Sequence, residues 1–485
     1  MIAPVLPSAS TSALLIGLLC IGLLPNASGT NSKLNPQAQA SVSLPNIVWI
    51  LIDDMGWRDL GCYWHGQHRT PHIDRMAAEG MKFTQAYANA PNCAPSRASM
   101  MTGTLPPRHG IYTVGSSKRG KSKNRKLIPL VNSTVLPDSA ITIAEHLRPH
   151  GYKSAAVGKW HLGDDPRTQG FDVNVAGDKS GHPKSYFSPY KNRNLEDGPE
   201  GENLTDRITT EALAFLEGEP EHPRFLYMTF FAVHTPVQGK EELRERYRAA
   251  ALEAGATEKE ARKAGHYGAM VETVDSNVGR LLERIDELER ETIVLLFSDN
   301  GGHASFTKMD PLRGSKGMLY EGGIREPLIL RAPGRIEAGQ VCEVPVTSVD
   351  FLPTMLAAAG IPVAQAAVLD GIDLSPLFAG ESLPERSLYW YFPAYLEGYT
   401  KQHGPWRTTP TCAVRRGNHK LIEYFDDGSF ELYDLEADAG ESRNLLSTHG
   451  EVGEQLKQDM ASWMKRVGVP DQFERNPEYE AASER

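Results

Sequence analysis

The chain has 485 residues, enough for one large domain with a smaller one, or for two to three ordinary domains. Hydrophobic residues make up 40% and charged residues 23%, which is typical of a globular protein with a normal core. The formal net charge of −10 argues against general nucleic-acid binding. One basic segment, residues 117–126 (SKRGKSKNRK), is an exception: either a solvated loop or the polyanion-facing rim of a substrate cleft.

The first residues have the pattern of an export signal. An apolar run from Ala13 to Leu24 precedes the small residues Ala27-Ser28-Gly29, which predicts a signal peptide over residues 1–29. A disordered leader is predicted for residues 30–44. No other stretch reaches membrane-spanning length. We therefore expect an exported protein, periplasmic or secreted, with no stable membrane span.

Cysteine is scarce. Cys20 lies in the predicted signal peptide, and Cys62, Cys93, Cys342 and Cys412 remain, far apart in the sequence. An exported chain so poor in cysteine does not depend on a disulfide framework, although one bridge is possible. Cys93 belongs to no C-x-x-C pair or zinc knuckle and lacks the local context of a cysteine protease nucleophile, so its use requires another explanation.

Four segments share one pattern, a continuous apolar run that ends in polar side chains. Such runs suit strands buried on both faces. The runs are Ile47–Ile52, Ala155–Val157, Phe225–Val233 and Ile293–Phe297. Helical patterns lie between them, for example at residues 71–83, 140–151 and 270–288. This alternation predicts an α/β fold with a large, mostly parallel central sheet flanked by helices on both sides.

Polar side chains follow each of the four runs. They are Asp53 and Asp54, Lys159 and His161, His234, and Asp299, Asn300 and His303. In open α/β sheets ligands bind outside the carboxyl ends of the strands. Any one of these groups alone would be consistent with an ordinary loop, but all four at carboxyl ends predict one shared site.

The pattern changes after residue 384. Short strand-like runs with turns between them precede an amphipathic helix at residues 451–468. We expect a large α/β domain over residues 45–384, a small C-terminal domain over 385–470 with an antiparallel sheet and one helix, and a loose tail over 471–485.

The acidic cluster offers only oxygen ligands. Asp53, Asp54, Asp299 and Asn300 suit a hard cation, Ca²⁺ or Mg²⁺, rather than Zn²⁺. Adjacent carboxylates would repel each other without a cation. The alternative for Asp53 and Asp54 alone is that they cap helices or turns.

Cationic candidates accompany these acids. They are Arg97, Lys159, Lys316 and Arg313. Cations beside a divalent metal suggest a tetrahedral oxyanion, a phosphate or a sulfate. Pro95 and Ser96 are expected to open a helix behind Cys93, whose N-terminus would attract an anion. Taken alone, Lys316 also fits a surface lysine in a glycine-rich loop.

Two histidines complete the set. His161 and His234 have side chains that titrate near neutral pH and serve as general acid or base. A lone histidine after a strand is more often structural, but both lie where the other polar groups converge.

Several motifs resemble one enzyme family. CAPSRASMMTG, residues 93–103, matches C-x-P-S-R-x-x-x-x-T-G, the signature of the type I, formylglycine-dependent sulfatases of the alkaline-phosphatase-like superfamily. The segments DDMGWRDLGCYW, GKWHLG, SDNGGH and RGSKGMLYEGGIREP resemble further blocks of that family, in family order, and YDLEADAGESRNL resembles its C-terminal pattern. The resemblance covers nearly all of residues 45–465 and is closest to bacterial carbohydrate sulfatases. It implies that residues 45–384 form the catalytic domain.

The resemblance implies a role for Cys93. A formylglycine-generating maturation enzyme would oxidise it to Cα-formylglycine (3-oxoalanine), whose hydrate is the nucleophile that attacks sulfur. Arg97 and the metal would favour the alkoxide. The implied metal ligands are Asp53, Asp54, Cys93 as modified, Asp299 and Asn300, and the implied ion is Ca²⁺, with Mg²⁺ as the alternative.

The resemblance also implies the remaining catalytic roles. His234 and Lys316 would bind the sulfate and protonate the leaving oxygen, and Lys159 and His161 would contact the diol. His161 would take the proton of the second hydroxyl, so that the aldehyde reforms and sulfate leaves.

The substrate is less well defined. Residues 177–192 (GDKSGHPKSYFSPYKN) are either a plain surface loop or a wall for a sugar ring, and resemble the segment of sulfatases that act on sulfated galactose or N-acetylgalactosamine. His182, His303 and Arg313 are the substrate-binding candidates. The alternatives are an arylsulfatase, a phosphatase, phosphodiesterase or phosphonate hydrolase of the same superfamily, and a non-catalytic sulfated-glycan-binding protein in which Cys93 remains a thiol.

Overall fold

A computed structural model describes residues 43–480 apart from residues 65, 67, 219 and 364–367, and it leaves the side chain of Tyr399 undescribed. The predicted signal peptide, Cys20 and residues 481–485 of the predicted tail lie outside the described residues, as do residues 30–42 of the predicted leader. None of the described helices combines the length and the apolar character that crossing a membrane requires. Cys62, Cys93, Cys342 and Cys412 are all free thiols.

A nine-stranded mixed sheet forms the centre of the molecule, with the order β4-β3-β5-β1-β6-β7-β2-β8 and with β9 paired to β2. Its strands are β1 (Asn46–Ile52), β2 (Met81–Tyr87), β3 (Lys153–Gly158), β4 (Val173–Val175), β5 (Arg224–Thr229), β6 (Thr292–Ser298), β7 (Arg325–Arg331), β8 (Gln340–Cys342) and β9 (Val346–Thr347). All pairings are parallel except those of β7 with β6 and β2. The predicted α/β fold is therefore confirmed.

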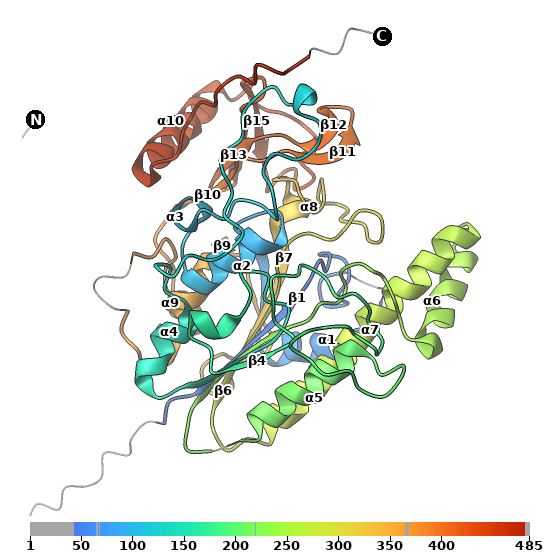
Figure 1. Ribbon diagram of the computed structural model, residues 1–485. Coiled ribbons are helices and arrows are strands. Elements are labelled where there is room, and N and C mark those ends of the chain that lie inside the picture. The colour runs from blue at the N-terminus through green and yellow to red at the C-terminus, as the bar shows by residue number, and fades with distance from the viewer. Residues whose placement is uncertain (1–42, 65, 67, 219, 364–367, 481–485) are drawn as a thin grey trace, which may run out of the picture. The chain divides into compact units, whose positions relative to one another are not determined.

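Helices cover both faces of this sheet (Figure 1). The α-helices are α1 (Pro71–Glu79), α2 (Cys93–Thr102), α3 (Pro106–His109), α4 (Ile143–Leu147), α5 (Leu204–Leu216), α6 (Glu241–Glu253), α7 (Glu258–Asp286), α8 (Glu321–Ile324), α9 (Phe351–Ala358) and α10 (Gly450–Val467). Short 3₁₀ helices lie at Ser122–Asn124, Arg148–His150, Pro166–Gln169, Ser348–Asp350 and Ser375–Ala379.

Strand β1 shows why both faces must be covered. Successive side chains of a strand point to opposite faces, and all seven residues of β1 are buried. Trp49 and Leu51 pack in the core with α2, α4 and α9, whereas Val48 and Ile50 pack in a second core with α1, α5 and α7. The continuous apolar runs read from the sequence are thus strands sandwiched between two helical layers.

Some predicted boundaries were wrong. The expected helix over 71–83 ends at Glu79, and residues 81–87 form β2 instead. The reason is close packing at Gly80, where an added Cβ would lie 2.2 Å from the carbonyl oxygen of Leu330, so the chain turns there to pair with β7. The α-helical part of 140–151 is only Ile143–Leu147, followed by a 3₁₀ turn.

Two other boundaries also differ. The predicted helix over 270–288 is the second half of a longer helix, α7, that ends at Asp286. The apolar run predicted as a strand over Phe225–Val233 leaves the sheet after Thr229.

The C-terminal region contains the predicted small antiparallel sheet and its helix, α10. The strands are β10 (Ser387–Phe392), β13 (Thr411–Arg416), β14 (His419–Tyr424) and β15 (Ser429–Asp434), in the order β10-β13-β14-β15. A separate hairpin of β11 (Leu396–Thr400) and β12 (Gly404–Thr408) was not expected from the sequence. The domain boundaries at 384 and 470 remain predictions.

A buried ion cluster joins the C-terminal sheet to the segment after β6. The ammonium group of Lys420, on β14, lies 2.9 Å from a carboxylate oxygen of Glu321 and 2.9 Å from one of Glu441. The hydroxyl of Tyr87 donates to Glu321 at 2.6 Å, and the backbone N–H of Glu321 donates to Glu441 at 2.7 Å. Three fully buried charges therefore fix the start of α8 against β14.

We predict that Glu441→Gln flattens one part of the dependence of stability on pH. Burial raises the pKa of Glu441 to about 7, with Lys420 lowering it and Glu321 raising it. Between 4.5 and about 7 the folded state holds more protons at this site than the unfolded state, so the free energy of unfolding falls as pH rises. In urea titrations across this range, the free energy of unfolding of the variant should decrease with pH less steeply than that of wild type. The two slopes should differ by up to about 1.4 kcal/mol per pH unit.

Glu381→Gln is the matched control, because the side chain of Glu381 is exposed to solvent. It should follow the wild-type slope. A Glu441→Gln slope that parallels wild type would show that the carboxyl group of Glu441 titrates normally in the folded state.

Candidate active site

The carboxyl ends of β3, β5, β1 and β6 lie side by side, because these four strands are consecutive and parallel in the sheet. The predicted polar groups follow directly from those ends. Asp53 and Asp54 extend β1, Lys159 and His161 follow β3, His234 comes after β5, and Asp299 and Asn300 extend β6. The expected convergence is thus a consequence of strand order.

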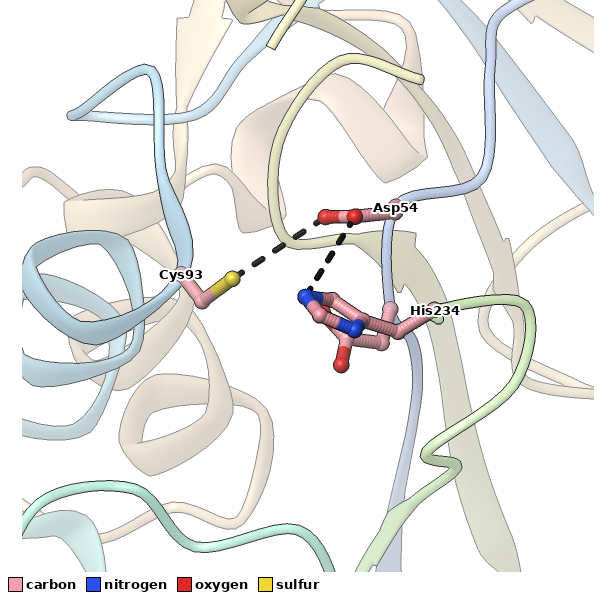
Figure 2. Close-up of side chains that lie close together, drawn as sticks. Asp54, Cys93 and His234 are labelled. Carbon is pink, nitrogen blue, oxygen red and sulfur yellow. Dashed lines mark hydrogen bonds and ion pairs between the residues drawn. The ribbon is translucent and has the colours of Figure 1, made fainter. Parts of the chain in front are cut away.

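Cys93 faces this cluster from the first residue of α2, two residues earlier than the helix start expected from Pro95. Its side chain is buried, and its Sγ lies 3.9 Å from Oδ1 of Asp54 and 3.2 Å from Nζ of Lys316. Figure 2 shows the thiol and the imidazole of His234 both directed at the Asp54 carboxylate. Cys93, with no partner nearby in sequence, therefore has its partners on distant strand ends.

The electrostatic surroundings activate the thiol. Burial raises the pKa of Cys93, but the positive charges of Lys159 and Lys316 outweigh it and lower the pKa to about 6. The position thus favours a negative charge on the atom that extends from residue 93.

Arg97 ties the strand ends together one turn further along α2. Its Nε donates to Oδ2 of Asp299 at 2.8 Å, and its Nη1 donates to the carbonyl oxygen of Lys159 at 2.7 Å and to the hydroxyl of Thr229 at 2.6 Å. Nη2 lies 3.8 Å from Oδ1 of Asp53. The guanidinium is fully buried, so these groups compensate its charge where water cannot.

Lys159 and Lys316 each hold one of the adjacent aspartates. Nζ of Lys159 donates to Oδ2 of Asp53 at 2.6 Å, and Nζ of Lys316 donates to both oxygens of Asp54, at 2.5 and 2.7 Å. The pKa of Asp54 is held below its usual range, because Lys316 and His234 together outweigh the effect of burial. Asp54 is therefore ionised in the folded protein.

The two histidines differ in charge state. Burial lowers the pKa of His161 well below its usual value, and the charges of Lys159 and Arg97 lower it further, so His161 is neutral. For His234 burial acts in the same direction, but Asp54 and Asp53 outweigh it and raise the pKa. One imidazole is thus suited to accept a proton and the other to donate one.

Four ligand atoms lie close enough to hold a metal ion, from Asp53, Asp54, Cys93 and His234, all within 4.8 Å of one another. The amide nitrogen of Asn300 donates to Oδ1 of Asp54 at 2.8 Å. In the described part of the chain, Oδ1 of Asn300 and Oδ1 of Asp53 have no hydrogen-bond partner. Two buried oxygens without donors fit a cation.

The pKa values of two of the acids also indicate that nearby positive charge would stabilise their ionised forms. The pKa of Asp53 is raised chiefly by burial, and that of Asp299 is raised first by burial and then by the charge of Asp53. Added positive charge would offset both effects, so the donor set fits the predicted hard cation. Asp54 and Asp299 already accept hydrogen bonds, Asp54 from Lys316 on both oxygens and Asp299 from Arg97 on its Oδ2.

Two site residues have left-handed backbone. Asp54 has φ 60° and His161 has φ 65°, a region that non-glycine residues seldom occupy. Both lie just after a buried strand, so the surrounding packing holds this strain at the site.

The three substrate-binding candidates lie in different surroundings. The ring of His182 stacks on that of His234, with centroids 6.1 Å apart and planes 9° apart. His303 interacts electrostatically with the cluster: burial lowers its pKa, and the charge of Asp54 raises it. Arg313 instead donates to the hydroxyl of Tyr433 and to the carbonyl oxygen of Glu441, both at 2.9 Å.

The loop that carries His182 reaches the cluster through Gly181. An added Cβ there would lie 2.7 Å from the ring of His161, so only glycine permits this approach. Residues 177–192 therefore contain at least two positions that border the site.

Two neighbours of the cluster could not be recognised from the sequence. Thr229 completes the hydrogen-bond network of Arg97, but it lies inside an apolar run. Arg407, on β12, donates to the carbonyl oxygen of Lys316 at 3.2 Å from almost a hundred positions further along the chain. Only the three-dimensional fold brings it there.

Comparison with known families gives two matches. The family model described as "Sulfatase" matches residues 45–361, and one described as "N-sulphoglucosamine sulphohydrolase, C-terminal" matches residues 314–466. The chain is 34% identical to N-acetylgalactosamine-6-sulfatase of Canis lupus familiaris over 385 residues, which cover 72% of this chain and 68% of that protein. It is 29% identical to a sulfatase of Formosa agariphila, which covers 88% of this chain and 90% of that protein.

A similar solved structure is that of Ps i-CgsB in complex with k-i-k-neocarrahexaose. It superposes with a TM-score of 0.72 at 28% sequence identity and covers 89% of this chain and 95% of that one. The likeness extends over the central sheet and the C-terminal region alike.

Arg97→Lys should destabilise the protein although it keeps the charge. A lysine ammonium cannot reproduce the three-directional fork that joins Asp299, Lys159 and Thr229, so buried acceptors lose their donors. We expect the free energy of unfolding, measured by urea denaturation, to fall by about 2–4 kcal/mol.

The control is Arg416→Lys, which changes an arginine that pairs with Glu385 and Asp459 at the surface. Its effect should stay below about 1 kcal/mol. Equal effects of the two substitutions would contradict the role assigned to Arg97.

Proposed function

The chain belongs to the sulfatase family and is a sulfuric ester hydrolase, and we propose that it acts on a sulfated carbohydrate with Cys93, oxidised to Cα-formylglycine, as the nucleophilic position. One observation carries the proposal. The only cysteine in the signature block is buried at a helix start, between the ammonium of Lys316 and the carboxylate of Asp54.

Charge balance favours a sulfate ester. Three carboxylates (Asp53, Asp54 and Asp299) are matched by three permanent cations (Arg97, Lys159 and Lys316). A bound divalent cation would leave the site with two excess positive charges. That excess suits a sulfate ester together with an ionised hydroxyl at position 93.

The modification would supply what a thiol lacks. Oxidation of Cys93 by a maturation enzyme would place an aldehyde there, whose hydrate offers one hydroxyl to attack sulfur and a second whose deprotonation releases the sulfate. A bound Ca²⁺ or Mg²⁺ would lower the pKa of the attacking hydroxyl. Asp53 and Asn300 each have an unpartnered oxygen that would hold that cation, and the carboxylates of Asp54 and Asp299 are the further candidates.

His234 is placed to protonate the leaving oxygen. Its Nδ1 lies 2.9 Å from the carbonyl oxygen of Thr235 and donates to it, which leaves Nε2 facing the cluster, 3.6 Å from Oδ2 of Asp54. Asp54 favours the proton on this ring, and Lys316 would neutralise the sulfate oxygens beside it.

His161 is placed to take the opposite proton. It is neutral, and its Nδ1 has no partner among the described residues. We propose that this neutral, buried imidazole accepts the proton of the second hydroxyl. Lys159 would then orient the diol through its contact with Asp53.

The carbohydrate part of the proposal rests on relatives and on the loop at 177–192. Relatives include N-acetylgalactosamine-6-sulfatases, and the solved neighbour holds k-i-k-neocarrahexaose. His182 and His303 border the sulfate position and provide polar edges for sugar hydroxyls. Export, proposed from the amino-terminal pattern, would bring the enzyme to extracellular polysaccharide.

We predict that the matured protein releases inorganic sulfate from mono-sulfated galactose or N-acetylgalactosamine. Cys93→Ala removes the nucleophilic position and should lower the rate at least about 1000-fold. Ion chromatography of released sulfate measures the activity, and mass spectrometry of the peptide with Cys93 measures the modification.

Cys342→Ala is the matched control, because Cys342 lies on edge strand β8, far in the sheet order from the site strands. It should retain full activity. An unmodified thiol at position 93 with no sulfate release would overturn the enzymatic mechanism. Turnover of aryl sulfates alone would overturn the carbohydrate substrate.

Removal of the metal should lower stability as well as activity. Ca²⁺ added to chelator-treated protein at 100-fold excess over its dissociation constant should stabilise the fold by about 2.7 kcal/mol. Asn300→Leu keeps the size of the side chain and deletes a ligand oxygen, so it should weaken this shift. The measurement is thermal unfolding with and without Ca²⁺ or Mg²⁺.

Asn418→Leu, at an exposed turn, should show the full shift. A wild-type protein that responds to neither ion, or an Asn300→Leu variant that responds fully, would contradict the assigned cation site.

A further inference from the structure

We propose that Arg407 and Arg119 form a second anion-binding site beside the sulfate-ester site, and that the preferred substrate carries a second anionic group near the ester that is cleaved. The inference rests on the proposed carbohydrate sulfatase function and specifies the substrate class. The second group is a sulfate or a carboxylate, since both present planar or tetrahedral oxygens that a guanidinium binds through paired hydrogen bonds.

Arg407 is one residue away from the chemistry. Its Nη1 donates to the carbonyl oxygen of Lys316 at 3.2 Å, and the ammonium of the same lysine lies 3.2 Å from Sγ of Cys93. A single lysine side chain thus separates the guanidinium of Arg407 from the nucleophilic position. A group on the same or the next sugar unit would span that gap.

The charge of Arg407 is not neutralised by an ion pair with a described residue. Within the described residues no carboxylate lies within ion-pair distance of Arg407, although the group is partly buried. Burial lowers its pKa, the distant charge of Asp54 opposes this, and the charge of Arg119 lowers it further. A half-buried cation next to another cation is costly unless an anion joins them.

Arg119 lies on the basic segment 117–126, which the structure packs against the same hairpin. Gly120 has φ 68°, and an added Cβ would lie 2.6 Å from the ring of Trp406, so the segment rests directly on the residue before Arg407. Nε1 of Trp406 donates to the carbonyl oxygen of Asn124 at 3.2 Å. The segment is therefore held in place, not merely solvated.

Three other basic side chains of this segment are already engaged. Lys123 pairs with Glu480 at 2.9 Å and Lys126 with Asp426 at 3.7 Å, while Arg125 donates to backbone carbonyl oxygens of residues 118–120. Arg119 donates to the carbonyl oxygen of Val114 and has no carboxylate partner in the part of the chain described. Arg119 makes one such contact where Arg125 makes three, so more of its donors remain for a ligand.

The test compares kcat/KM for doubly anionic and singly anionic substrates. Wild-type protein, Arg407→Met and Arg119→Gln would be assayed on three galactose-type substrates: a mono-sulfated sugar, the same sugar with a second sulfate, and a disaccharide that adds a uronate carboxylate. We expect wild-type kcat/KM to be higher for one or both doubly anionic substrates. Each variant should reduce that preference by about 10- to 100-fold, mainly through KM.

Arg407→Lys should recover part of the preference because it restores the charge, and Lys123→Gln removes a charge from the same segment without affecting the preference. Equal losses on all three substrates in Arg407→Met would assign Arg407 to holding Lys316 and overturn the proposal. A wild-type enzyme without preference would overturn it too. A wild-type enzyme that cleaves none of the sugars would instead contradict the proposed function. Which doubly anionic substrate is preferred distinguishes sulfate from carboxylate.

Discussion

The compensation of buried charge by Arg97 is the constraint on which the site depends. Its guanidinium has no access to water, and every direction in which it donates ends on a group from a different strand. Asp299 and Asp53 can stay in the interior only because this cation and Lys159 are present. This charged cluster is therefore also a part of the core, where adding or removing one charge affects all the others.

Around this cluster the fold provides rigidity from two directions. The four parallel strands set the positions of the acids and of His161 and His234, while α2 brings Cys93 and Arg97 from one helical layer. Lys316 comes from a loop that ends at Glu321, and Lys420 of the C-terminal sheet holds that residue. The small sheet thus helps to hold the loop that carries Lys316.

Sequence alone was sufficient for features that depend on local pattern. Apolar runs followed by Asp, Lys or His predicted the strands and the residues at their ends. A buried strand and its end can both be recognised from the types of consecutive residues. Sequence alone was insufficient where contacts between distant segments determine the end of an element or the neighbours of the site. Gly80 ends a helix because β7 lies against it, and Arg407 reaches Lys316 only through the hairpin. Arg313 donates to Tyr433 and Glu441, and its role in substrate binding stays a prediction.

The contact between Arg407 and Lys316 has a consequence for how this enzyme can diversify. Arg407 donates to a backbone carbonyl oxygen, which every amino acid possesses, so this contact does not constrain which residue stands at position 316. Substitutions in β11 and β12 can accumulate while the reacting groups remain unchanged. Recognition of new polysaccharides would then evolve on one short hairpin, separately from the chemistry that cleaves them.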